Sequence, residues 1–291
     1  MDYRSKCAAL KALVLDRELT FVMEAHNALS AKIAEECGFP AIWASGLSIS
    51  ASMGLADRNH ASWTQVLDVS EFMADHVNVP ILIDGDTGFG NYQNVIRLTR
   101  KLGQKGIAGL CLEDKVFPKL NSFLGESQAL TPAEDFCSKL RAAKDAQLDG
   151  NFVVVARTEA LVSGLGMNEA LERAHKYLEA GADAILIHSK NSTSDEVVEF
   201  ARLWESRCPL VVVPTKYYRT PASVFRSARI SCVIWANQNL RSAISAMRRT
   251  SERIMRTESI MEVEDEIASL EEVFRLTGEM QAQEADRRYA T

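Results

Sequence analysis

The sequence predicts an α/β protein of the (β/α)₈, or TIM-type, barrel class. Eight short runs rich in β-branched residues alternate with amphipathic stretches of helical spacing, and no Pro/Ser-rich linker divides the chain. The 291 residues suffice for one barrel of roughly 250 residues. A doubly wound open sheet is the main alternative, but its Gly-x-Gly-x-x-Gly fingerprint is absent. We therefore expect a single domain over 1–291, with the barrel over about 15–256 and a C-terminal helical extension over about 257–291.

The expected strands are short apolar runs at residues 21–25, 41–45, 81–84, 109–113, 152–157, 184–188, 210–214 and 232–236. The expected helices between them carry apolar residues at helical spacing, at residues 29–37, 62–76, 92–105, 132–147, 168–180 and 193–206. At three helix-to-strand junctions a glycine follows the helix, namely Gly38, Gly106 and Gly181, where a left-handed C-cap position favours glycine. Two further helical patterns, 241–256 and 259–276, follow the last strand, although a barrel needs only one helix there.

Composition is that of a soluble globular protein, with 47% apolar and 25% charged residues, which excludes disordered, collagen-like and coiled-coil chains. The 33 Lys+Arg against 39 Asp+Glu give a net charge of −6, which argues against non-specific binding to nucleic acid or membrane. The first residues show no signal peptide, and no apolar run approaches the roughly 20 residues of a membrane span, so we expect a cytoplasmic protein. Six dispersed cysteines without Cys-x-x-Cys indicate reduced core thiols rather than a zinc site.

Polar or ionisable residues follow every expected strand. In chain order they include Glu24 and His26, Ser45, Asp84 and Asp86, Glu113 and Lys115, Arg157 and Glu159, His188 and Lys190, Thr215 and Lys216, and Asn237. Any one of them could be a turn or a helix cap. In a barrel, however, the C-terminal strand ends meet at one mouth, where catalytic sites form, so eight together predict an active site.

Acidic residues form one part of the predicted site. Asp84, Asp86 and Glu113 would crowd the mouth, with Asp57 as a possible fourth member. Carboxylates this close repel one another unless they are protonated or neutralised by a cation. Because the donors are hard oxygens with no Cys or His pair, Mg²⁺ fits best, bound directly by one carboxylate and through water by the others. A set of solvated loop acids is the alternative.

Cationic and amide side chains form the other part: Arg157, His188, Lys119, Asn121 and Ser122. Arginine offers a planar fork to phosphate or carboxylate, and the Gly-rich turn at 87–90 could expose backbone N–H groups. A metal on one side and these donors on the other suit an anionic oxyacid, for example a phosphorylated one.

Residues 113–122, Glu-Asp-Lys-Val-Phe-Pro-Lys-Leu-Asn-Ser, resemble the signature of the phosphoenolpyruvate mutase family in the isocitrate lyase superfamily. The likeness spans nearly the whole chain, with further matching segments at 23–27, 42–48, 61–65, 79–84, 187–190, 213–218 and 233–237. It implies a barrel whose final helices are exchanged between subunits, commonly in a homotetramer of paired dimers. It also implies Mg²⁺ held by Asp84, with Asp86 and Glu113 acting through water.

For the substrate, the resemblance implies that Ser45, Gly46 and Leu47 cradle the pyruvyl carboxylate and carbonyl, with Trp43 as an apolar wall. Because phosphonopyruvate formation is uphill, the resemblance also implies a downstream enzyme such as a decarboxylase, and we expect no nucleic-acid or membrane partner.

On the phosphoryl side, the resemblance assigns Arg157 and His188 to the phosphoryl or phosphonyl group. Lys119, Asn121 and Ser122 would lie on a mobile loop, about 115–130, that closes over the substrate. Asp57 occupies the place of an essential aspartate, which either takes the phosphoryl group covalently or orients a dissociating one.

The implied reaction interconverts phosphoenolpyruvate and phosphonopyruvate. Phosphonopyruvate hydrolase is the nearest alternative, but it carries Thr where this chain has Asn121. A C–C lyase such as methylisocitrate lyase would need a cysteine in a Lys-Cys-Gly-His-like loop, where this chain has Lys-Val-Phe-Pro at 115–118. A non-catalytic metabolite-binding barrel would be expected to lack charged site residues, and none is missing.

Three departures from the family pattern occur. Gly85 replaces the usual Ala between the two metal-site aspartates, and Ala44 replaces a Gly before Ser45. Residues 123–126 also differ from the usual loop, so we expect gating to differ in detail.

Overall fold

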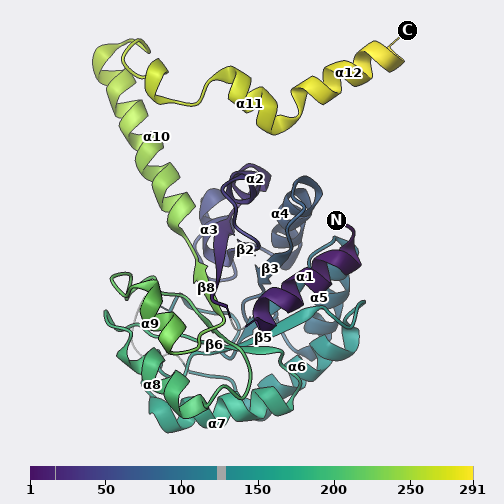
Figure 1. Ribbon diagram of the computed structural model, residues 1–291, viewed down its shortest axis with the longest axis vertical. Helices are drawn as coiled ribbons and strands as arrows, with labels where there is room; N and C mark the ends of the chain where they lie inside the picture. Colours follow the sequence, from purple (N-terminus) through teal and green to yellow (C-terminus); the bar gives the residue numbers. More distant parts are fainter. Residues whose placement is uncertain (17, 123–128, 291) are drawn as a thin grey trace. The chain divides into compact units, whose positions relative to one another are not determined.

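The computed structural model describes residues 1–16, 18–122 and 129–290. Eight parallel strands form a closed barrel in chain order (Figure 1). They are β1 (Thr20–Ala25), β2 (Ile42–Ala44), β3 (Ile81–Asp84), β4 (Gly109–Glu113), β5 (Val153–Thr158), β6 (Ala184–Ile187), β7 (Leu210–Val212) and β8 (Cys232–Trp235). Each expected strand is present, and β3 and β4 have the expected bounds. The (β/α)₈ class is therefore confirmed, and the doubly wound sheet is excluded.

Helices follow the strands and surround the barrel: α2 (Ala28–Glu36), α3 (Gly46–Ser52), α4 (Trp63–His76), α5 (Tyr92–Gln104), α6 (Ala133–Ala146), α7 (Gly166–Glu179), α8 (Asp195–Trp204) and α9 (Ala222–Ser227). Asn27 and Ser62 begin α2 and α4 with capping boxes, which satisfy backbone N–H groups of the first turn. Gly38, Gly106 and Gly181 have φ angles of +89°, +78° and +99°, as their junctions predicted. The short helices α3 and α9 were not predicted, because their apolar patterns are too short to show a helical period.

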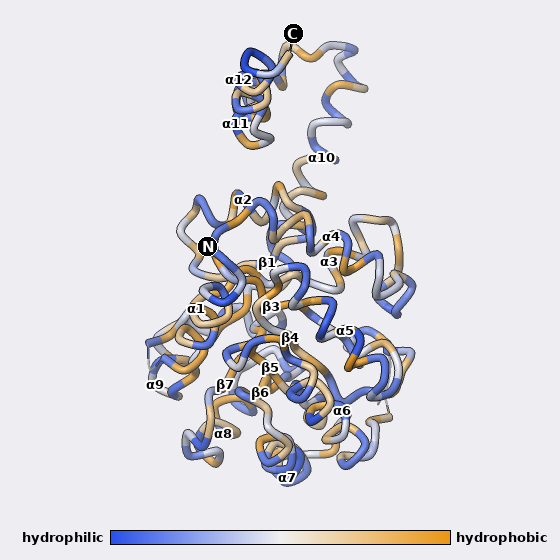
Figure 2. Tube along the Cα trace, turned by 90° about the vertical axis from the view of Figure 1, so that its right-hand side faces the viewer, coloured by the Kyte–Doolittle hydropathy of each residue, from blue (hydrophilic) through white to orange (hydrophobic). Residues whose placement is uncertain are grey.

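The strands form the core of the barrel. Every residue of β2, β3, β4, β6 and β7 is buried, and the hydrophobic colouring of the strands in Figure 2 agrees with this. One face of each strand packs against the helices, and the other face packs inside the barrel. Strands that are buried on both faces have nearly continuous apolar sequences. This burial fixes the strand ends from which the polar side chains of the mouth project.

An N-terminal helix, α1 (Tyr3–Leu15), precedes the barrel and was not predicted. Its Leu10 Cδ2 lies 2.7 Å from the place of a Cβ on Gly109, the first residue of β4, so α1 packs against the N-terminal end of the barrel. Lys6 Nζ donates hydrogen bonds of 2.8 Å to the carbonyls of Ala74 and Val77, at the end of α4. These contacts stabilise carbonyls that a helix end leaves without partners.

Residues Gln238–Thr291 form a second compact unit, distinct from the unit Met1–Asn237. It contains α10 (Gln238–Thr257), the 3₁₀ helix η1 (Glu264–Glu266), α11 (Leu270–Thr277) and α12 (Glu279–Tyr289). The expected helix at 241–256 lies within α10, but one continuous helix over 259–276 is wrong. Ile267 is extended, and the Ser269 side chain accepts a hydrogen bond from Glu272 N, so a new helix begins there.

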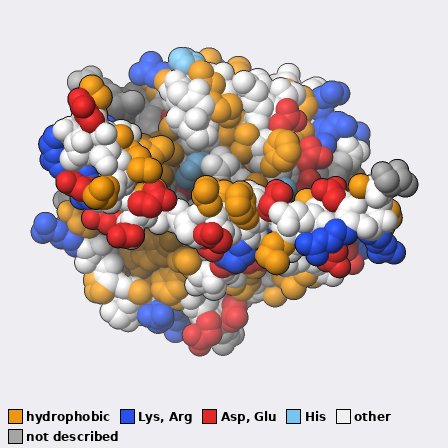
Figure 3. All heavy atoms as spheres, turned by 90° about the horizontal axis from the view of Figure 1, so that it is seen from above, with side chains coloured by type: hydrophobic (Ala, Val, Ile, Leu, Met, Phe, Trp, Pro, Cys, Tyr) orange, Lys and Arg blue, Asp and Glu red, His pale blue; other side chains and the backbone are white. Residues whose placement is uncertain are grey.

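Most side chains of this second unit are exposed. Among its described residues only Leu240, Val263 and Leu276 are buried. Large apolar side chains remain exposed at Ile244, Met247, Met255, Ile260, Met261, Leu270, Val273, Phe274 and Met280, and Figure 3 shows apolar side chains exposed among charged ones. None of the helices in the part of the chain that the structure describes has both the length and the apolar character needed to cross a bilayer.

Candidate active site

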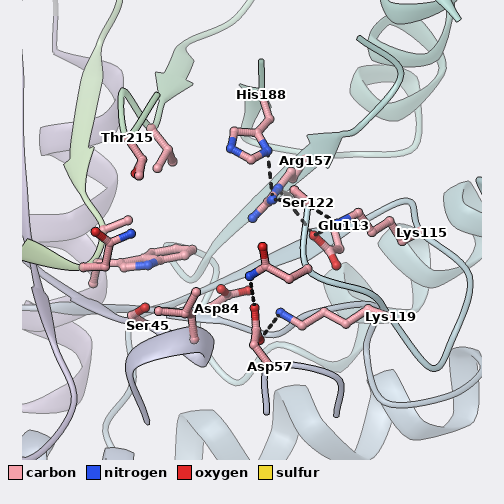
Figure 4. A pocket seen from close by; sticks show the side chains of 16 residues that line it. Ser45, Asp57, Asp84, Glu113, Lys115, Lys119, Ser122, Arg157, His188 and Thr215 are labelled. Carbon is pink, nitrogen blue, oxygen red and sulfur yellow. Dashed lines mark hydrogen bonds and ion pairs between the residues drawn. The ribbon is translucent and has the colours of Figure 1, made fainter. Parts of the chain in front are cut away.

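A polar cavity opens at the C-terminal ends of the strands (Figure 4). Its lining consists of Trp43, Ser45, Leu47, Asp57, Asp84, Glu113, Lys115, Lys119, Asn121, Ser122, Arg157, His188, Val213, Thr215, Ala236 and Asn237. All the predicted site residues except Gly46 and Asp86 are in this set. Thr215 and Asn237 were recognised as polar strand ends but not as site residues. Their position shows that the seventh and eighth strands also contribute to the mouth.

The acidic side is built on the ends of β3 and β4. Asp86 lies in a left-handed turn, with φ of +49°, and its backbone N–H donates to Asp84 Oδ1 at 3.2 Å. A Cβ on the intervening Gly85 would meet Leu110 Cδ1 at 2.2 Å and the Cys111 carbonyl oxygen at 3.0 Å, so an alanine here would require the Leu110 side chain to shift. Glu113 N donates to the Asp86 carbonyl at 2.8 Å, which joins the two strand ends.

The electrostatics of this side favour a bound cation. Burial raises the pKa of Asp86 to about 8; the charge of Lys119 opposes this, and Asp84, Asp57 and Glu113 add to it. Burial is the main cause of this shift, and the three neighbouring carboxylates add to it. A cation at this point would return Asp86 to its ionised form.

The donor set fits magnesium held largely through water. Glu113 Oε1 is buried and has no hydrogen-bond partner among the described residues. A Cβ on Gly46 would lie 3.1 Å from Asp86 Oδ1 and 3.3 Å from Asp84 Oδ2, so the glycine keeps space beside these oxygens. Within residues 1–16, 18–122 and 129–290 no three His, Cys, Asp or Glu side chains converge closely enough to ligate one ion directly. Magnesium usually retains several waters, so it does not need direct contact with every carboxylate of the site.

Helix α3 begins at the same side of the cavity. Ser45 is its N-cap and accepts a hydrogen bond from Ser48 N at 3.2 Å. Gly46 and Leu47 follow in the first turn, where backbone N–H groups have no intrahelical acceptor. With Trp43 from β2 beside them in the lining, these groups can bind a carboxylate next to an apolar wall.

Lys119 and Asn121 both contact Asp57, and Figure 4 shows the ion pair between Lys119 and Asp57. Lys119 Nζ lies 2.7 Å from Asp57 Oδ1 and 2.5 Å from Asp86 Oδ1, and Asn121 Nδ2 donates to Asp57 Oδ2 at 2.6 Å. Burial opposes ionisation of Asp57, but Lys119 and Asn121 hold its pKa below the usual value. Asp57 is therefore an ionised carboxylate in the cavity wall.

Asn59 connects this group to the acidic side and was not predicted. Its Oδ1 accepts from Lys119 N at 2.8 Å, and its Nδ2 donates to Asp86 Oδ2 at 2.7 Å. The sequence around it carries no signal for this role, which depends on the direction of the amide.

The opposite side consists of donors that suit a phosphoryl group. Arg157, from β5, donates through Nη2 to Ser122 Oγ at 2.9 Å and lies 3.0 Å from His188 Nδ1 (Figure 4). Burial lowers the pKa of His188 although Glu159 opposes the shift, so its imidazole is neutral at pH 7. A guanidinium, an imidazole and a hydroxyl thus converge opposite the acidic side.

Glu159 lies directly behind these donors. It is fully buried, and its Oε1 accepts from Arg157 Nε and lies 2.8 Å from His188 Nδ1. The polar end of the fifth strand was visible in the sequence, but nothing there distinguished Glu159 from a helix cap.

Comparison with known proteins identifies the family. A family model described as phosphoenolpyruvate phosphomutase matches residues 10–255, which include the whole cavity. The chain belongs to the phosphoenolpyruvate phosphomutase family.

Two phosphomutases are similar over nearly their full lengths. The enzyme of Tetrahymena pyriformis is 52% identical over 98% of this chain and 95% of that protein. The crystal structure of the phosphomutase from Streptomyces platensis subsp. rosaceus superimposes with a TM-score of 0.95 at 42% identity, covering 98% of this chain and 99% of that one. A phosphonopyruvate hydrolase in complex with oxalate and Mg²⁺ gives a TM-score of 0.92 at 38% identity, with complete coverage of both chains.

The structure explains one departure from the phosphomutase pattern. Leu110 Cδ1 fills the space that the methyl group of the usual Ala would need at Gly85. Ala44 is fully buried, and nothing in the structure explains its replacement of the usual Gly. The third departure, at 123–126, lies outside the described residues.

Proposed function

We propose that this protein is a Mg²⁺-dependent phosphoenolpyruvate mutase, an isomerase that interconverts phosphoenolpyruvate and phosphonopyruvate. The phosphoryl group moves between the enol oxygen and C3 of the pyruvyl unit. The observation that carries the proposal is the two-sided cavity: acidic groups suited to a cation face donors suited to a phosphoryl group, with Asp57 beside both. Membership of the phosphomutase family supports it.

The acidic side and α3 would bind the pyruvyl unit. Mg²⁺, held by Asp84 with Asp86 and Glu113 acting through water, would stabilise the negative charge of the enolate. The backbone N–H groups of Gly46 and Leu47 bind the pyruvyl carboxylate.

The migrating group is held by several cationic and polar side chains. Arg157 presents its planar fork and His188 its imidazole, while Lys119, Asn121 and Ser122 contact the group from the loop. Asp57 has one of two roles. It either accepts the phosphoryl group covalently, or orients the dissociated group between its release from one substrate atom, the enol oxygen or C3, and its bonding to the other. Either role requires the ionised carboxylate that Lys119 and Asn121 stabilise.

The loop at about 115–130 would keep water from the migrating group. Lys115 pairs with Leu130 in an isolated antiparallel bridge, which brings the two ends of the loop together. Exclusion of water matters because water would turn transfer into hydrolysis.

Phosphorus NMR of the protein with phosphonopyruvate and Mg²⁺ tests the function. We expect the phosphonopyruvate signal to be replaced by that of phosphoenolpyruvate, and no conversion in a matched sample with EDTA. Formation of inorganic phosphate and pyruvate instead would show a hydrolase. Absence of any conversion, with phosphonopyruvate still bound, would show a non-catalytic binding protein.

We also propose a homotetramer in which paired subunits exchange their C-terminal helices. The many large apolar side chains left exposed in Gln238–Thr291 support this, because burying such side chains against another subunit would remove them from water. Size-exclusion chromatography with light scattering should give four times the 32.2 kDa chain mass. A monomeric mass would contradict the proposal.

A further inference from the structure

Glu159 is a buried carboxylate to which four polar groups converge. Oε1 accepts from Arg157 Nε and lies 2.8 Å from His188 Nδ1, while Oε2 accepts from Ser122 Oγ at 2.9 Å and lies 3.6 Å from Lys115 Nζ. Its side chain has no exposed surface, and it does not line the cavity. Glu159 can therefore act on a substrate only through its neighbours.

We propose that Glu159 is a positioning residue that orients Arg157, His188 and Ser122 toward the phosphoryl group. This inference rests on the proposed function and extends it to a residue outside the cavity lining. Its backbone is fixed as well, since Glu159 N donates to Asp114 Oδ1 at 2.9 Å. Both the backbone and the carboxylate of Glu159 therefore have hydrogen-bond partners within the protein.

The contact with His188 determines how the imidazole is presented. Nδ1 lies near both a carboxylate, which only accepts, and the Arg157 guanidinium, which only donates. With Glu159 ionised, Nδ1–H donates to Oε1, and the ring edge that carries Nε2 turns toward the cavity that His188 lines. Without the carboxylate, Nδ1 would instead accept from Arg157, which reverses the tautomer.

The contact with Arg157 holds the guanidinium on the phosphoryl side of the cavity, away from the acidic side. Arg157 Nε pairs with Glu159 Oε1 and lies 3.4 Å from Glu113 Oε2, on the acidic side. If residue 159 lost its charge, Glu113 would be the carboxylate nearest to the guanidinium. Arg157 would then move toward Glu113 and away from the phosphoryl group.

The contact with Ser122 links the loop to these donors. Ser122 Oγ lies 2.9 Å from Glu159 Oε2, 2.9 Å from Arg157 Nη2 and 2.5 Å from Lys115 Nζ. A hydroxyl has one proton to donate and two lone pairs, so it donates to Glu159 and accepts from the two cations. The hydroxyl of Ser122 thus connects Glu159 to both cations.

Glu159→Gln, which keeps the shape and removes the charge, tests the inference. We expect kcat/KM for phosphonopyruvate to fall by about 10- to 100-fold, by analogy with the loss found when a residue that orients a metal ligand is removed. Glu159→Asp, which keeps the charge on a shorter stem, should recover part of the loss. Glu199→Gln removes a carboxylate that pairs with Arg202 on the surface of α8 and serves as the control, with unchanged kinetics.

A double-mutant cycle with His188→Asn separates positioning from a structural role. If Glu159 acts through His188, the loss from Glu159→Gln will be at least threefold smaller in the His188→Asn background, because coupled residues are not additive. Losses that multiply, or a Glu159→Gln enzyme within twofold of wild type, would overturn the inference. If Glu159→Gln does not fold, as judged by circular dichroism and urea unfolding, Glu159→Asp replaces it in the cycle.

The role of Glu159 can be tested independently of the proposed reaction. If the wild-type protein leaves phosphonopyruvate unconverted, the proposed reaction fails. The same cycle run on the dissociation constant of phosphonopyruvate, measured by calorimetry with Mg²⁺, would still decide the role of Glu159.

Discussion

Replacing Lys119 by Met tests how the acidic side of the mouth is neutralised. In the wild type, Nζ lies 2.7 Å from Asp57 Oδ1 and 2.5 Å from Asp86 Oδ1, and the lysine is 5% exposed. Methionine keeps an unbranched stem but leaves both carboxylates without this cation. Removing one partner of a buried ion pair costs about 3–5 kcal/mol. Because Asp86 can take up a proton, we expect the lower value, a loss of about 3 kcal/mol in the free energy of unfolding in EDTA.

Magnesium should restore part of this loss. A ligand at 100 times its dissociation constant stabilises the folded state by about 2.7 kcal/mol. We expect Lys119→Met to gain more from Mg²⁺ than the wild type does, because no ammonium group competes for Asp86. The difference in stability between the two proteins should therefore narrow by at least about 1 kcal/mol.

Urea unfolding followed by tryptophan fluorescence, in EDTA and in saturating Mg²⁺, measures both effects. Lys101→Met is the matched control, since this ammonium donates to Gln104 on the surface of α5 and should change neither value. Equal stability of Lys119→Met and wild type in EDTA would refute the ion-pair argument. Equal stabilisation of the two by Mg²⁺ would refute the competition for Asp86.

Three further predictions follow from the same geometry. Asp57→Ala should fold but lose at least about 100-fold in turnover of phosphonopyruvate, by phosphorus NMR, and wild-type-like activity would remove its assigned role. Burial raises the pKa of Asp114 to about 6, so this group's contribution to stability is present below about pH 4 and lost as the pH rises through 6. The unfolding free energy of wild type minus that of Asp114→Asn should then fall by up to about 3 kcal/mol over this range, and a constant difference would contradict it. Gly85→Ala should lower the unfolding free energy by about 1–3 kcal/mol, because the added methyl group clashes with Leu110. A second substitution, Leu110→Val, should reduce that loss. A melting temperature of Gly85→Ala equal to that of wild type would show that the turn accommodates the methyl group.

The barrel could be predicted because its local signals agree with one another. Strands β3 and β4 follow glycine or proline turns, consist of apolar residues and end at a carboxylate, so both of their bounds were predicted. Helix α1 was missed because its role arises from a distant contact, the packing of Leu10 where Gly109 leaves space. No pattern within α1 contains that information.

The members of the site could be predicted better than their connections. Strand ends of a barrel meet at one mouth, so Asp84, Glu113, Arg157 and His188 were expected together and line one cavity. The connections through Glu159 and Asn59 depend on side-chain direction, which sequence spacing does not determine. Residues that orient others are therefore the part of an active site that a sequence conceals most easily.

The charge of the mouth explains how a chain of net charge −6 can bind an anion. Five carboxylates meet there, Asp57, Asp84, Asp86, Glu113 and Glu159, against the three cations Lys115, Lys119 and Arg157. If all five were ionised, two negative charges would remain, which is the charge that one divalent cation balances. Without such a cation, burial and the neighbouring carboxylates raise the pKa of Asp86 to about 8, so it holds a proton at pH 7. The mouth therefore binds a cation first. Once the cation has neutralised the acidic side, Arg157 and Lys119 can attract the phosphoryl group. The distribution of charge, rather than its sum, sets the substrate class.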